Sequence, residues 1–342
     1  MARFIKTLKK TALAASIASL ATVANATIVT SIKPLGFIAS SIADGVTDTE
    51  VLVPAGASPH DYSLKPSDIQ KLQGAELILW VGEDIDAFLD KTLRPMPFKK
   101  VLSIADFAEI GGLLEGEAHD HKHEHDHTHK HDHDHKHDHD HKHDHAHKHE
   151  HDHKHNHEHK HDHAHGHDHD HSTNWHVWYS PEISKIVATR LATRLTEAYP
   201  EKKEKIAQNL AEFNRTLAEQ SEKIKQQLAP VKEKGFYVFH DAYSYFNNAY
   251  GLKQTGYFTI NPLVAPGAKT LAKIKQEIKE HKVNCLFAEP QFTPKVIESL
   301  SKGTGVHVGR LDPMGDAVKL GVNSYANFLQ YTADSYFACL SK

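Results

Sequence analysis

The feature that most constrains this sequence is a tract from His119 to His171 in which every odd-numbered residue is histidine, twenty-seven in all. The residues between them are mainly Asp, Glu and Lys, so the tract has almost no apolar surface to bury. A segment of this composition cannot offset the entropy lost on ordering, and it predicts a disordered loop despite its strand-like alternation. Any folded core must therefore come from the residues on either side.

The tract itself predicts weak metal binding. Neutral imidazole is the commonest metal ligand, and a flexible chain of imidazoles can wrap zinc, nickel, copper or cobalt. We expect many weak sites that collect metal for a tighter one. A neutral repeat expansion in a surface loop is the alternative, and histidine-rich tracts occur in several kinds of protein.

The N-terminus has the pattern of a secretory signal peptide. Four basic residues within residues 1–10 precede an apolar run over residues 11–23, and Ala24-Asn25-Ala26 forms a cleavage signature. Residues 1–26 are therefore predicted to be removed. A membrane anchor is the alternative, but the apolar run is short for one, and no later segment is apolar enough to enter a bilayer. With no cysteine near the cleavage point, we expect an exported mature protein that is free in solution, without direct membrane insertion.

Strand-like and helix-like segments alternate on both sides of the tract, which predicts an α/β fold with parallel sheets flanked by helices. In the first half, strands are expected at Ile28–Ile32, Val51–Val53, Glu76–Val81 and Val101–Ile104, with a helix at Pro66–Leu72. In the second half, strands are expected at Phe236–Phe239, Lys253–Tyr257, Cys285–Ala288 and Val306–Leu311, with helices at Lys269–Lys282, Pro294–Ser301 and Ser324–Leu340. Apolar residues at helical spacing over Glu201–Leu228 predict one long helix between them. We expect an N-terminal lobe over 27–200 that includes the loop 119–171, a linking helix over 201–230 and a C-terminal lobe over 231–342.

Charge and cysteine content narrow the function. The net charge of −4 is the balance of −7 in the histidine tract and +4 in the signal peptide, which leaves the remainder near −1. That balance gives no electrostatic footprint for nucleic acid. The two cysteines, Cys285 and Cys339, favour one disulfide in an exported protein over a thiol metal site.

Five histidines lie outside the tract, and three of them stand in contexts typical of a binding site. His60 lies in a loop between a strand and a helix, and His240 ends an apolar strand, where α/β folds place ligands. His176 stands among Trp175, Trp178 and Tyr179, which could form the dry wall of a metal site. The alternatives are an exposed loop histidine for His60 and satisfied core histidines for the other two. We interpret the remaining pair, His281 and His307, as structural.

At these residues the chain resembles the periplasmic zinc-binding proteins of bacterial ABC importers, a solute-binding family that also takes up manganese. The matching motifs are G-A-S-P-H-D-Y-S-L-K-P-S-D (56–68), W-H-V-W-Y-S-P-E (175–182), F-Y-V-F-H-D-A-Y (236–243), F-A-E-P-Q-F (287–292) and R-L-D-P-M-G (310–315). They occur in the family's order and span essentially the whole mature chain. The histidine-rich loop before the second motif is typical of the zinc branch.

The resemblance implies two α/β lobes joined by one long rigid helix, with the metal in the cleft between them. His60 and His176 would be ligands from the first lobe and His240 the ligand from the second. Imidazole at the third position goes with zinc, as three nitrogen ligands do on chemical grounds. Asp312 or water would fill the fourth position, because Pro59 stands where some relatives carry a glutamate. Glu289 would orient a ligand or line the cleft, and the family's disulfide matches Cys285 and Cys339.

The function implied is capture of Zn²⁺ and its delivery to the membrane permease of an ABC importer, by a monomer. A stand-alone periplasmic metal buffer or chaperone is the alternative. We expect no enzymatic activity, because the sequence has neither a His-Glu-x-x-His helix nor a nucleophile elbow. Zinc affinity is expected to fall as the pH drops through about 6.5, where free imidazole takes up a proton.

Overall fold

The computed structural model describes residues 27–116, 173–292 and 295–342. The predicted signal peptide and the histidine tract lie outside the described residues, so their predictions stay untested. The two main sheets belong to one compact unit. Among the described helices, none combines the length and apolar character needed to cross a bilayer.

The first sheet is parallel, with the strand order β2-β1-β3-β4. Its strands are β1 (Thr27–Thr30), β2 (Asp48–Val51), β3 (Leu77–Trp80) and β4 (Val101–Ser103), and its helices are α1 (Lys33–Ile42), α2 (Pro66–Gly74), α3 (Glu83–Asp86) and α4 (Asp90–Leu93). The central strand β3 is buried along its whole length, whereas the edge strand β2 has exposed polar residues in alternation. The sequence prediction placed that edge strand at Val51–Val53 because only those residues are apolar.

The second sheet is also parallel, with the order β10-β9-β7-β8. Its strands are β7 (Phe236–His240), β8 (Gln254–Thr259), β9 (Cys285–Ala288) and β10 (His307–Arg310), accompanied by α7 (Ser244–Tyr250), α8 (Ala268–Lys279) and α9 (Lys295–Thr304). The helix α8 ends before its predicted limit at Lys282, since His281 adopts a positive φ of 57°. Between the two halves, the short strands β5 (Glu115–Gly116) and β6 (Thr173–Asn174) pair with each other.

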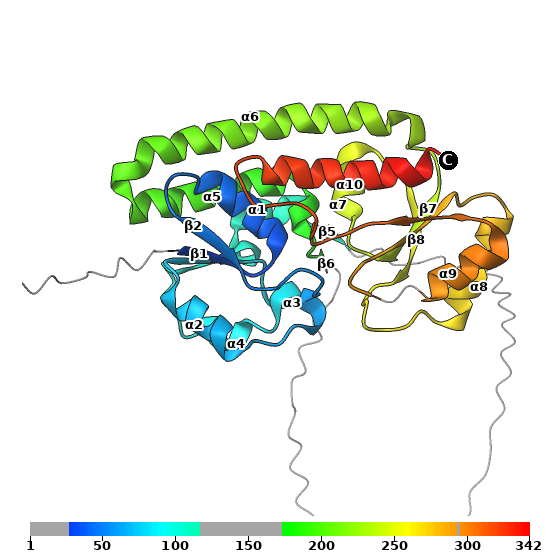
Figure 1. The fold of residues 1–342 in the computed structure, drawn as a ribbon, viewed down its shortest axis with the longest axis horizontal. Helices are drawn as coiled ribbons and strands as arrows, with labels where there is room; N and C mark the ends of the chain where they lie inside the picture. Colours follow the sequence, from blue (N-terminus) through cyan, green and yellow to red (C-terminus); the bar gives the residue numbers. More distant parts are fainter. Residues whose placement is uncertain (1–26, 117–172, 293–294) are drawn as a thin grey trace, which may run out of the picture. The chain divides into compact units, whose positions relative to one another are not determined.

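Three long helices run beside the sheets (Figure 1): α5 (Pro181–Ala198), α6 (Lys203–Leu228) and α10 (Ser324–Leu340). The predicted long helix is α6, preceded by a 3₁₀ turn over Pro200–Lys202. The last helix, α10, packs against α6 and α1 as well as against β10. Its buried residues cover most of its circumference, so it requires neighbours on several sides. The two sheets are therefore tied by α6 and α10 together, and the prediction of parallel sheets joined by a long helix is confirmed.

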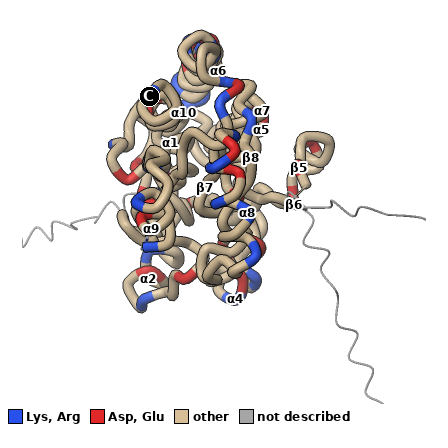
Figure 2. The backbone as a smooth tube through the Cα atoms, turned by 90° about the vertical axis from the view of Figure 1, so that its right-hand side faces the viewer, with Lys and Arg blue, Asp and Glu red and all other residues tan. Residues whose placement is uncertain are grey.

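Charges are mixed over this framework. Basic and acidic positions are interspersed over the described backbone in Figure 2, and most ion pairs are exposed, such as those that Arg215 makes within α6. Exposed pairs contribute little to stability, at most about 1 kcal/mol each. Burial of apolar side chains along α6 and α10 is therefore the main interaction that holds these helices against the rest of the fold.

The predicted disulfide is present and joins Cys285 of β9 to Cys339 of α10, with a Cα–Cα distance of 6.2 Å. Both residues are buried, so the bond lies inside the packed interface of sheet and helix. It closes a loop of 54 residues. A cross-link of this length restricts the unfolded chain and stabilises the folded one by about 4 kcal/mol in the chain-entropy model.

We expect the double variant Cys285→Ala, Cys339→Ala to lose about 3–4 kcal/mol in free energy of unfolding, measured by urea titration. Zinc binding under native conditions should be unchanged, because α10 keeps its apolar contacts and neither cysteine is near the candidate ligands. Wild-type protein treated with reductant is the matched control. Equal stability of the oxidised and double-variant proteins would contradict the expectation.

Candidate metal centre

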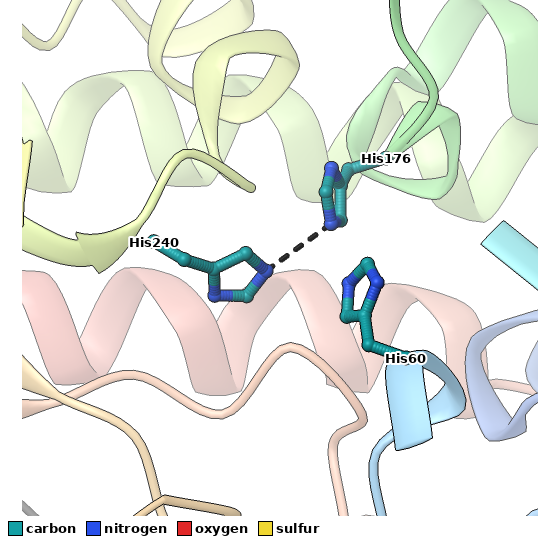
Figure 3. Close-up of side chains that lie close together, drawn as sticks. All are labelled: His60, His176 and His240. Carbon is teal, nitrogen blue, oxygen red and sulfur yellow. Dashed lines mark hydrogen bonds between the residues drawn. The ribbon is translucent and has the colours of Figure 1, made fainter. Parts of the chain in front are cut away.

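Three of the five histidines outside the tract converge on one point (Figure 3). His60, His176 and His240 each offer a ring nitrogen, and these nitrogens lie within 4.8 Å of one another. The ring centroids of His176 and His240 are 5.0 Å apart. The ring centroid of His60 lies 5.7 Å from that of His176 and 5.6 Å from that of His240. His281 and His307 are exposed and take no part in this group.

His240 is fixed by a carboxylate. It ends β7, and its Nδ1 lies 2.7 and 2.8 Å from the two oxygens of Glu289. Glu289 directly follows β9, the strand that pairs with β7, so the two strand ends bring these side chains together. The Tyr243 hydroxyl donates to the same carboxylate at 3.0 Å. Because a carboxylate only accepts, Nδ1 carries the proton and Nε2 keeps its lone pair.

His176 is fixed by a neighbouring amide. The Asn174 side chain accepts from the backbone N–H of His176 at 3.1 Å and lies 2.7 Å from its Nδ1. The amide nitrogen of Asn174 donates in turn to Asp241 O at 2.8 Å, which leaves Oδ1 to face the imidazole. Nδ1 is therefore the protonated nitrogen here too, and Nε2 is free to coordinate.

The two free nitrogens face each other. His176 Nε2 and His240 Nε2 are 3.2 Å apart. With both protons on Nδ1, this contact brings together two lone pairs, which repel unless a cation lies between them. A tetrahedral zinc ion about 2.0–2.1 Å from each nitrogen would separate them by about 3.3 Å. The spacing and the donor chemistry both fit such an ion.

His60 approaches from the first sheet's side. It lies in the 3₁₀ turn Pro59–Asp61, which begins after Ser58, whose hydroxyl accepts from the His60 backbone N–H at 3.3 Å. Among the described residues, its ring makes no hydrogen bond, in contrast to the rings of His176 and His240. Its position therefore depends on the loop that carries it.

The surroundings of the group are mostly apolar, with Ser58 and Gln291 as the polar residues beside the histidines. The cavity holding the three rings is also lined by Trp178, Phe292, Pro313 and Met314. Trp178 stands 5.1 Å from the His176 ring, whereas Trp175 and Tyr179 pack into the hydrophobic core, so one of the three predicted aromatics forms the wall. His240 is 2% and His176 8% exposed.

Burial sets the protonation of two of these rings. It lowers the pKa of His60 to about 3, and the neighbouring His240 adds to the effect. Burial also lowers the pKa of His176 well below its ordinary value, with smaller contributions from His240 and His60. Both rings therefore stay neutral at a pH that would protonate free imidazole. For these two candidate ligands, the loss of zinc affinity is expected at a lower pH than the value of about 6.5 drawn from the sequence.

Asp312, a predicted candidate for the fourth position, is engaged elsewhere. Its oxygens accept from the backbone N–H groups of Met314 at 3.0 Å and Asp316 at 2.7 Å, and from the side chain of Gln291 at 2.8 Å. These bonds build the turn that follows β10. Within the described residues, the convergent group consists of the three imidazoles without Asp312.

The chain as a whole is similar to known zinc-uptake proteins. The family described as zinc-uptake complex component A, periplasmic, matches residues 28–339. The chain is 70% identical to the high-affinity zinc uptake system protein ZnuA of Haemophilus influenzae, over 98% of this chain and 99% of the relative. It is 54% identical to the protein of the same name from Haemophilus ducreyi, again over 98% and 99%. The chain belongs to the ZnuA family.

Among solved structures, a crystal structure of ZnuA matches at a TM-score of 0.67 with 22% identity, covering 92% of this chain and 99% of that one. This likeness supports the fold alone. Membership in the ZnuA family confirms the resemblance drawn from the motifs, and it places the chain among periplasmic solute-binding proteins for zinc import rather than in a class of enzymes.

Asn174 is a residue beside the three histidines whose contact with His176 the sequence interpretation missed. An asparagine that accepts from the backbone N–H two residues later forms an Asx turn, a pattern that Asn174-Trp175-His176 could have suggested. Its second bond, to the imidazole, depends on the ring's orientation and has no sequence signal.

We expect Glu289→Gln to weaken zinc binding by about 10- to 100-fold, the usual effect of losing a partner that orients a ligand. The amide would no longer offer two accepting oxygens to His240 Nδ1 and Tyr243. Calorimetric titration measures the loss, and Glu298→Gln, at an exposed position on α9, is the control. An unchanged affinity would show that Glu289 does not orient His240.

The lowered pKa values of His60 and His176 predict little proton release on zinc binding. At pH 5.5 these two rings are already neutral, so zinc displaces no proton from them, and the site should release no more than about one proton. Three ordinary imidazoles would release nearly three. Calorimetry of a variant lacking residues 119–171, in buffers of different ionisation enthalpy, counts the protons. Release of two or more would contradict the expected neutrality.

Proposed function

We propose that this protein captures one Zn²⁺ ion with His60, His176 and His240 and delivers it to the membrane permease of an ABC importer. The observation that carries the proposal is the pair of Nε2 lone pairs facing each other at 3.2 Å, each set by a hydrogen bond on the opposite side of its ring. Family membership supplies the transport context. Three neutral nitrogen ligands suit zinc better than a hard ion such as manganese.

The fourth position belongs to water or to a group that arrives during transfer. Asp312 remains a candidate from sequence, but ligation would require its carboxylate to give up hydrogen bonds that hold the turn of residues 312–316. A site with three protein ligands is easier to unload than one with four, which suits a protein that must release its ion. The protein is proposed to act as a monomer, since both sheets of one chain supply the ligands.

The histidine tract is proposed to collect metal weakly and to supply the tight site. Its imidazoles alternate with carboxylates in the sequence, a composition that attracts divalent cations without a fixed geometry. The second candidate function, a stand-alone periplasmic metal buffer, would use the same ligands. The two differ only in transfer, so a transport assay with the reconstituted permease separates them.

The capture proposal predicts that His60→Ala, His176→Ala and His240→Ala each abolish one tight zinc equivalent and leave the weak equivalents. Removing residues 119–171 should do the reverse. Calorimetry gives both stoichiometries, and metal analysis of protein purified without immobilised-metal affinity checks the bound ion. His307→Ala, at an exposed histidine of β10, is the matched control. Loss of the tight equivalent only on removal of the tract would refute the assignment.

A further inference from the structure

The segment that leads from β10 to α10, residues 311–323, crosses from the second sheet to the first (orange to red in Figure 1). On its way it contacts the chain near all three histidines. The indole Nε1 of Trp178, two residues after His176, donates to Pro313 O at 3.1 Å. Gln291, two residues after Glu289, donates to Asp312 at 2.8 Å. We call residues 312–316 the crossover turn.

The third contact of the crossover turn is with the loop of His60. The Gly56 backbone N–H donates to Asp316 Oδ2 at 2.7 Å, and the Lys33 ammonium group donates to the Asp316 backbone carbonyl at 2.7 Å. Gly56 has a φ of +78°, a conformation that glycine adopts without strain, and this directs its N–H toward the carboxylate. Asp316 thus joins the second half of the chain to the loop that carries a ligand four residues later.

The His60 loop is also the ligand segment that most needs such a tether. The rings of His176 and His240 are oriented by their own hydrogen bonds to Asn174 and Glu289. Within the described residues the ring of His60 has none, so its approach to the metal is set by the backbone of residues 56–61. A hydrogen bond that fixes the backbone of residues 56–61 therefore also fixes the position of the His60 ring relative to the metal site.

We propose that Asp316 is a positioning residue that holds the His60 loop against the crossover turn and thereby slows the departure of zinc. This inference rests on the proposed three-histidine site. The bond is charge-assisted, since a carboxylate accepts from the peptide N–H, and it is partly open to solvent. Its loss frees His60 to leave first and the ion to follow, while the other two rings keep their orientation.

The test is the rate at which zinc leaves the mature full-length chain, loaded with one equivalent and mixed with an excess of a chromogenic zinc chelator in a stopped-flow instrument. The slow phase is assigned by His240→Ala, which should lack it. Asp316→Ala should speed the slow phase by roughly five- to tenfold, the effect expected for one partly exposed charge-assisted hydrogen bond. Asp316→Asn keeps an accepting oxygen and should stay within about twofold of wild type.

Two controls separate positioning from folding. Asp48→Asn changes an exposed aspartate on β2 and should leave the rate unchanged. The melting temperature of the zinc-free protein should fall by only a few degrees in Asp316→Ala, the effect of one lost hydrogen bond, because the backbone bonds of residue 316 to Lys33 and Asp312 remain. If the alanine variant does not fold, Asp316→Ser, which keeps those bonds but has too short a side chain to reach Gly56, should show the same faster release.

The outcomes distinguish this proposal from the site on which it rests. A slow phase that is lost in His240→Ala but unchanged in Asp316→Ala overturns the role of Asp316 and leaves the three-histidine site intact. Equal acceleration by alanine and asparagine overturns it too, because the accepting oxygen would then be irrelevant. A slow phase that persists in His240→Ala refutes both.

Discussion

The contact on which the site depends is between two nitrogens that would repel each other without a cation. His176 Nε2 and His240 Nε2 lie 3.2 Å apart, and neither ring can turn away without giving up the bond on its other nitrogen. The protein thus fixes the repulsive arrangement with groups outside the metal site, a carboxylate on one side and an amide on the other. On the proposed function, zinc binding removes the repulsion, so rings that are oriented before the ion arrives raise the affinity.

This arrangement requires that the two sheets keep their relative position. His240 and Glu289 come from the second sheet, whereas His60 follows the first, so a small displacement between them would separate the ligands. The helices α6 and α10 resist it through buried side chains such as Phe213 on α6, which stacks on Tyr325 of α10 at 5.6 Å. The disulfide then fastens α10 to β9, whose end carries Glu289.

Sequence patterns predicted the features that arise from regular periodicity along the chain, namely its helices and most of its strands. Strand–helix alternation identified parallel sheets, and helical spacing identified α6, because both reflect burial of local segments. The prediction of Val51–Val53 for the edge strand was largely wrong, since the observed strand β2 (Asp48–Val51) has few apolar residues. The role of α10 between the sheets was hidden, because its apolar residues show that it is buried but not what covers it.

In the candidate metal site, too, features with a local sequence pattern were predictable, and contacts between distant segments were not. Histidines at strand ends and in a strand–helix loop were identifiable as candidates, because parallel folds gather such positions at one edge. The roles of Asn174 and Asp316 were not, since they depend on distances between segments far apart in sequence. The hydrogen bonds of Asp312 also had no sequence signal: the family motif makes this aspartate a candidate ligand, and the structure adds that the backbone N–H groups of Met314 and Asp316 donate to its oxygens.

The three ligands also differ in how firmly the protein holds them, and this bears on release. Two imidazoles are fixed by direct hydrogen bonds in a buried setting, whereas His60 is positioned through its loop and makes its approach from a less buried place. An ion held equally by three rigid ligands would have no preferred order of departure. With one ligand held indirectly, we infer that the bond to that ligand breaks first and that the ion leaves on the side of the His60 loop. On the proposed function this inequality is useful, because all three ligands are needed for tight binding, whereas the ligand that is held indirectly can leave without disturbing the other two.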